Sequence, residues 1–141
     1  MKRALVIVPF ALSGKELDNR RSQTKSVDLG PDIEFDFKPV NAGPSSFMSA
    51  HDWAIMELAI FEAGVNAQQD GYDALVIDTL SDSGMAPLRS ILDIPVISPG
   101  KASMLFALML GNRFGILAQW DKALVRYKKA AIEYGLSEHC I

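Results

Sequence analysis

Residues 72–84 read YDALVIDTLSDSG, an apolar run at 74–77 followed at once by a polar loop. A short run rich in β-branched residues between polar segments is typical of a strand that is buried on both faces. The run at residues 4–8 has the same character and ends at Pro9. Two such runs predict a mainly parallel sheet with helices on both faces.

The rest of the chain alternates between strand and helix patterns. Ile33, Phe35 and Phe37 alternate with charged residues, which predicts a half-buried edge strand over 33–40. Ser49 and Asp52 resemble a capping box and open a long helix. We predict further strands over 94–97 and 114–118, and helices over 14–25, 49–69, 85–92, 102–110 and 121–134. This order predicts an α/β three-layer sandwich with a mainly parallel sheet, of flavodoxin or Rossmann type.

Composition and charge exclude several functional classes. Of the 141 residues, 49% are hydrophobic and 22% charged, which is typical of a globular protein. The net charge of −3 argues against a nucleic-acid binder. One cysteine and two histidines exclude an intramolecular disulfide and a histidine-rich metal site. The apolar run before Pro9 is too short for a signal peptide or a membrane span, so we expect a cytoplasmic protein.

The end of the chain resembles its beginning. Residues 113–118, followed by an amphipathic helix, match the pattern of residues 2–7 and their helix. This predicts an N-terminal α/β domain at 1–112 and the incomplete beginning of a second, similar domain at 113–141. Chance similarity is the alternative, because every α/β protein contains such units.

Three loops follow the carboxyl ends of predicted strands, where open parallel sheets bind ligands: residues 9–13, 41–46 and 78–84. The third is the richest in polar groups. Hydroxyls and free N–H groups at a helix start suit a carboxylate. In the alternative interpretation Asp82 or Ser83 is simply the N-cap of the next helix, and residues 43–46 form a turn.

Common cofactor motifs are absent from the sequence. No Gly-x-Gly-x-x-Gly follows the first strand, and there is no P-loop and no Gly-x-Ser-x-Gly elbow. We therefore expect a site that takes a small anion and uses no cofactor and no metal.

Residues 72–84 and 92–97, the loop at 42–46 and residues 111–117 together resemble the aspartate/glutamate/hydantoin racemase superfamily. The resemblance implies two α/β domains around a cleft and proton transfer, without a cofactor, at a carbon next to a carboxyl or carbonyl group. In typical members one cysteine from each domain acts as acid or base, because a thiol pKa can be tuned near working pH.

The sequence departs from this pattern in two ways. Thr79 occupies the position of the first cysteine, between Asp78 and Asp82. The chain also ends at Ile141, before the position of the second cysteine, and Cys140 does not correspond to it. We expect residues 113–141 to pack on the first domain, to pair with another copy in a homo-oligomer, or to remain poorly supported.

The resemblance implies a racemase or isomerase acting on a small amino acid, hydantoin or dicarboxylic acid. Relatives without the first cysteine include decarboxylases, so a decarboxylase and a non-catalytic anion-binding module are the alternatives. Thr79 and Asp82 are the predicted catalytic residues. The predicted substrate-binding residues are Pro9, Phe10, Ser45, Ser46, Ser81, Ser83 and Gly84.

Overall fold

A four-stranded sheet forms the centre of the molecule. The computed structural model describes residues 1–28, 30–44 and 46–141. The strands are β1 (Lys2–Val8), β2 (Ile33–Pro39), β3 (Ala74–Ile77) and β4 (Val96–Ile97). Their order is β2-β1-β3-β4, and all neighbouring pairs are parallel. The predicted edge position of the strand at 33–40 is therefore confirmed.

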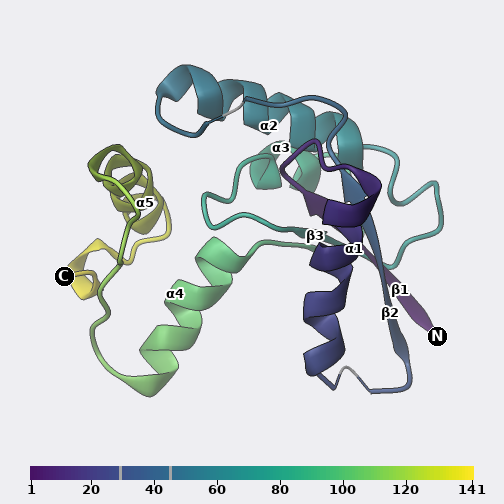
Figure 1. The fold of residues 1–141 in the computed structure, drawn as a ribbon. Coiled ribbons are helices and arrows are strands. Elements are labelled where there is room, and N and C mark those ends of the chain that lie inside the picture. Colours follow the sequence, from purple (N-terminus) through teal and green to yellow (C-terminus); the bar gives the residue numbers. More distant parts are fainter. Residues whose placement is uncertain (29, 45) are drawn as a thin grey trace.

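Helices lie on both sides of this sheet (Figure 1). Figure 1 places α2 and α3 on one side of the sheet and α1 on the other. The helices are α1 (Gly14–Ser22), η1 (Gln23–Ser26), α2 (Ala50–Gly64), α3 (Met85–Arg89), α4 (Pro99–Leu110), α5 (Asp121–Glu133) and η2 (Ser137–His139). The predicted α/β sandwich with a parallel sheet is confirmed. None of the described helices is long and apolar enough to span a membrane.

The main core lies between the sheet and the α2–α3 side. Alternate residues of β1 and β3 point to that side, as the two-residue period of a strand requires. Burial of each large apolar side chain contributes about 1.5–3 kcal/mol to folding. The cluster includes Leu5, Ile7, Leu75 and Ile77 from the strands and Met56, Ile60, Ala63, Met85 and Leu88 from the helices.

The predicted capping box at the start of α2 is confirmed. Ser49 Oγ accepts a hydrogen bond from the Asp52 N–H, and the Asp52 carboxylate accepts from the Ser49 N–H at 3.0 Å. A hydrogen bond from the Met48 N–H is the main reason why the pKa of Asp52 is lowered. The α-helix ends at Gly64, before the predicted end at residue 69.

The strand predicted over 114–118 is wrong for the described structure. Phe114 makes one isolated parallel bridge with Cys140, and residues 115–118 belong to no strand. A β pattern forms a strand only where a neighbouring edge is available for pairing. Leu117 is fully exposed instead.

The C-terminal segment packs on α4. A second buried cluster joins Met104 of α4 with Phe114, with Ala130 and Ala131 of α5, and with Leu136. The expectation that residues 113–141 pack on the preceding chain is therefore met by these contacts. The predicted division into two domains at residue 112 stays a prediction.

Candidate functional site

A cavity of about 350 Å³ lies at the carboxyl ends of β1 and β3. This is the edge of the sheet at which parallel α/β folds bind ligands. Its walls come from the loops after β1 and β3, from α1, from α2 and the loop before it, and from residues 117–127. Its lining residues are Pro9, Phe10, Arg20, Phe47, Trp53, Asp78, Thr79, Leu80, Ser81, Leu117, Gln119, Trp120, Ala123, Arg126 and Tyr127.

The structure brings together four of the predicted site residues: Pro9, Phe10, Thr79 and Ser81 line the cavity. Four of the other predicted residues are not in this lining. Ser46 is exposed, whereas Asp82 and Ser83 are buried members of the loop at 78–84, which we call the site loop. Gly84 opens α3, and Ser45 lies outside the described residues.

Three hydroxyl groups form a chain along the site loop. Thr79 Oγ1 lies 3.0 Å from Ser81 Oγ, which lies 2.9 Å from the buried Ser83 Oγ. Within the described residues, no carboxylate or imidazole is hydrogen-bonded to any of the three hydroxyls. A hydroxyl without a basic partner is a poor proton acceptor at neutral pH, but it donates hydrogen bonds well. This arrangement can therefore bind an oxygen atom of a ligand.

The Asp82 carboxylate is engaged away from the cavity. It accepts hydrogen bonds from the backbone N–H groups of Gly100 (2.9 Å) and Lys101 (2.7 Å), in the first turn of α4. It also accepts one from the Tyr134 hydroxyl of α5 at 2.5 Å. The catalytic role predicted for Asp82 stays a prediction, and the observed contacts are those of a residue that positions α4 and α5.

The alternative interpretation, in which Asp82 or Ser83 caps the helix after the loop, is wrong. Gly84 occupies the N-cap of α3, with φ of 79° and no side-chain cap. A side chain at Gly84 would place its Cβ 2.6 Å from Ile60 Cγ2 of α2. Glycine is therefore required here by the backbone and by close packing. Roles for Ser83 and Gly84 in substrate binding stay predictions.

Aromatic residues that the sequence did not single out line one wall. Phe47 packs edge-on against Phe10, with ring centroids 5.2 Å apart, and Trp53 of α2 lies on the same wall. The position of Trp53 in an amphipathic pattern did not distinguish it from core residues.

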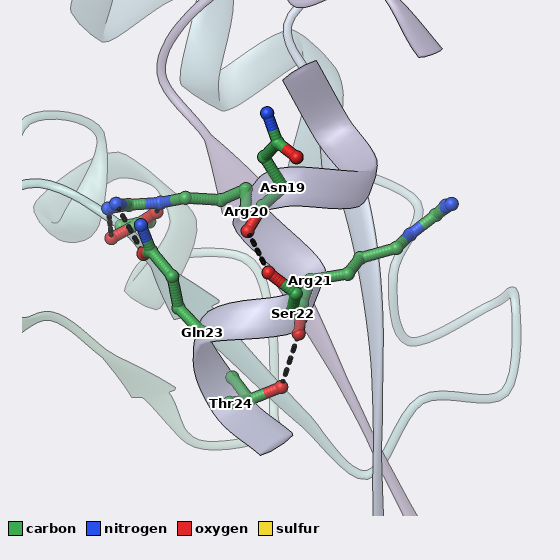
Figure 2. Close-up of polar contacts among 7 residues, drawn as sticks. Asn19, Arg20, Arg21, Ser22, Gln23 and Thr24 are labelled. Carbon is green, nitrogen blue, oxygen red and sulfur yellow. Dashed lines mark hydrogen bonds and ion pairs between the residues drawn. The ribbon is translucent and has the colours of Figure 1, made fainter. Parts of the chain in front are cut away.

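Arg20 forms a second feature that the sequence did not indicate. Its Nε and Nη2 atoms donate to the two oxygens of Asp78 at 2.5 and 2.6 Å, and its Nη1 donates to Gln23 Oε1. Figure 2 shows Arg20 and Gln23 extending to one side of α1 and Arg21 to the other. The hydrogen bond to Asp78 is the main cause that raises the Arg20 pKa. The pair supplies a polar wall whose charges cancel.

Arg126 and Trp120 approach the cavity from the C-terminal segment. Arg126 Nη2 donates to the backbone carbonyl of Ser81 at 3.1 Å. The Arg126 Nε and Trp120 Nε1 atoms are buried and have no hydrogen-bond partner within the described residues. Helical periodicity alone did not separate Arg126 from the solvated face of its helix.

The described residues contain no group of three or more His, Cys, Asp or Glu side chains that could hold a metal ion. Cys140 lies on a different, largely apolar cavity with Ile116 and Tyr127. The polar side chains that line the site cavity are thus hydroxyls, two guanidinium groups, two indoles, the Asp78 carboxylate and the Gln119 amide.

Comparison with known families places the sequence in one of them. The model of the Asp/Glu/Hydantoin racemase family matches residues 18–141. The chain belongs to this family. The relatives that match it over most of its length carry the names of racemases.

A hydantoin racemase from a Pseudomonas strain is 25% identical over 121 residues, which cover 86% of this chain and 45% of that protein. An allantoin racemase structure from Klebsiella pneumoniae superposes with a TM-score of 0.88 at 26% identity, over 99% of this chain and 56% of that one. A second allantoin racemase, from Pseudomonas fluorescens, has a TM-score of 0.85 at 20% identity, over 98% and 57% of the two chains, and supports the fold. The chain thus spans about half the length of these relatives.

Proposed function

We propose that the protein containing this chain is a racemase of small cyclic ureides of the hydantoin type. A base removes a proton from a carbon next to a carbonyl group to leave a planar enolate, and a proton from solvent adds to the opposite face, with no cofactor. The observation that carries the proposal is the hydroxyl pair of Thr79 and Ser81 in the cavity at the end of β3. The names and folds of the racemase relatives support the reaction class.

In this proposal Thr79 donates a hydrogen bond to the carbonyl oxygen of the substrate and does not remove the proton. When a proton leaves the carbon next to a carbonyl, negative charge develops on the carbonyl oxygen. A hydrogen-bond donor aimed at that oxygen stabilises it, typically by about 3–4 kcal/mol in a site closed to water. The Thr79 hydroxyl can donate such a bond while Ser81 Oγ, 3.0 Å away, donates to Thr79 in turn.

Proton removal requires a group with a pKa near the working pH. In the proposal this group is not Asp78, because both of its oxygens accept hydrogen bonds from Arg20. The family resemblance implies a cysteine from the second domain on the other side of the substrate carbon. In the proposal, the chain described here therefore supplies the half of the site that binds the carbonyl oxygen of the substrate.

The aromatic wall supports a small planar substrate. Phe10, Phe47 and Trp53 line the same cavity as Thr79. A flat ring with polar edges can lie against such a wall while its carbonyl oxygens reach the hydroxyls and N–H groups. The cavity of about 350 Å³ is in the range of small-molecule sites.

The test follows proton exchange in D₂O. The complete protein is incubated with one enantiomer of a 5-substituted hydantoin, and NMR measures deuterium at the ring carbon while polarimetry measures loss of optical rotation. Thr79→Ser should keep most activity because the hydroxyl remains. Thr79→Val removes the donor at similar volume and should lower kcat by about 100-fold or more.

Ser90→Ala is the matched control, because it removes a hydroxyl that is exposed on the C-terminal side of α3 and bonded to the Pro87 carbonyl. It should leave turnover unchanged. Release of CO₂ from a carboxylated substrate, without loss of rotation in the hydantoin, would favour the decarboxylase alternative. Binding without either reaction in the complete protein would favour a non-catalytic module and would refute the proposal.

A further inference from the structure

We infer that Arg126 and Trp120 form a carboxylate-binding pocket at one end of the cavity, which selects substrates that carry an acidic substituent. The inference rests on the proposed function, because it concerns the substrate of the same site. Nothing in the family match assigns a role to either residue.

Two side chains that line the cavity each carry a donor without a partner among the described residues. The Arg126 Nε and Trp120 Nε1 atoms are buried without a hydrogen-bond partner among the described residues, and both side chains line the cavity. A buried polar group without a partner destabilises the fold, and most such groups in native proteins are satisfied. Two unsatisfied N–H groups on one cavity therefore indicate an acceptor supplied by a ligand.

The charge of Arg126 indicates that this acceptor is anionic. No ion pair in the described part of the chain includes Arg126. Arg20, the other guanidinium of the cavity, is neutralised by Asp78. The remaining lining residues carry no charge, so the described wall has an excess of one positive charge, at Arg126. A carboxylate complements this charge better than a neutral amide does.

The geometry also suits a carboxylate. Arg126 Nη2 is held by the Ser81 carbonyl at 3.1 Å, which fixes the guanidinium beside the site loop. Ser81 also belongs to the hydroxyl chain that includes Thr79. A substrate whose carbonyl oxygen meets Thr79 can therefore present an acidic substituent to the Arg126 Nε and the Trp120 indole N–H. Guanidinium groups bind carboxylates through paired N–H donors.

The experiment compares two probes of nearly equal shape, hydantoin-5-acetate and hydantoin-5-acetamide, in the complete protein. Calorimetry measures their dissociation constants, and loss of optical rotation measures KM and kcat. The acetate should bind at least about tenfold more tightly than the acetamide. Arg126→Gln should reduce this ratio by about tenfold to a hundredfold, mainly through KM.

Two further variants and a control complete the experiment. Trp120→Phe keeps an aromatic ring without the N–H and should also reduce the ratio, whereas Arg126→Lys should preserve part of it. Lys122→Gln removes an equal charge from an exposed position on the same helix and should leave the ratio unchanged. If Arg126→Gln weakens both probes alike, the ratio is unchanged and the inference is wrong.

Equal binding of the two probes by the unmodified protein, or an unchanged ratio in Arg126→Gln, would overturn the inference. Racemisation of both probes at equal efficiency would leave the proposed function standing and refute the pocket. A preference for the acetate that depends on Arg126, in a protein that racemises neither probe, would refute the proposed function and leave the pocket standing.

Discussion

Replacing Tyr134 by Phe removes a single hydroxyl that joins α5 to the site loop. The hydroxyl donates to Asp82 Oδ2 at 2.5 Å, and Asp82 is only 6% exposed. A hydrogen bond to a charged group contributes about 1.5–3 kcal/mol, and the upper part of this range applies where the acceptor is buried. We expect Tyr134→Phe to lower the free energy of unfolding by about 2–3 kcal/mol.

Tyr72→Phe provides a control of the same chemistry at the surface. The Tyr72 hydroxyl donates to Asp36 Oδ2 at 3.1 Å, but the Asp36 side chain is 42% exposed and is also paired with Arg3. Water and Arg3 can replace the lost donor there, so we expect a loss of about 0.5 kcal/mol or less. A cation lies over the ring of each tyrosine, and phenylalanine keeps that contact in both variants.

Urea unfolding followed by circular dichroism measures both variants. In a background carrying Asp82→Ala, the acceptor is absent and Tyr134→Phe should cost far less than in the unmodified protein. The reasoning would be refuted if Tyr134→Phe cost no more than Tyr72→Phe, or if its cost were the same with and without the Asp82 carboxylate.

Three further outcomes are expected. Gly84→Ala should cost about 1–3 kcal/mol more than Gly71→Ala, because both glycines have positive φ but only Gly84 lies against Ile60; equal losses in thermal unfolding would contradict this. Ser49→Ala should cost about 1 kcal/mol in urea unfolding, through loss of the α2 cap, and no loss would show that the cap contributes nothing. Burial and the hydrogen bond to Asp82 raise the pKa of Tyr134 above 10.0. Its contribution to the free energy of unfolding is therefore complete below about pH 10 and declines at higher pH. Urea midpoints measured up to about pH 11 should fall less steeply with pH in Tyr134→Phe than in the unmodified protein.

The sequence predicted the elements that are determined by local pattern. The apolar runs at 4–8 and 74–77 became β1 and β3, because burial on both faces needs continuous apolar residues. Residues 33–39 became the edge strand through their alternation. The strand predicted at 114–118 is wrong because a strand also needs a partner, and Phe114 finds only Cys140.

The candidate site was predicted at the right edge of the sheet but with an incomplete set of residues. The rule for parallel sheets located Thr79 and Ser81, since they directly follow a buried strand. It did not indicate Arg20, because nothing local marks one arginine of a polar helix as the partner of Asp78. The sequence also did not indicate that the Asp82 carboxylate accepts hydrogen bonds from the first turn of α4, because that helix begins far along the chain.

The same long-range contacts bear on the predicted domain boundary at residue 112. The cavity has Thr79 and Ser81 on one side of this boundary and Trp120 and Arg126 on the other. Hydrogen bonds from Tyr134 to Asp82 and from Arg126 to Ser81 hold the two sides together. Tyr134 also packs against both buried clusters. The segment at 113–141 therefore supplies part of the cavity wall whichever domain it belongs to.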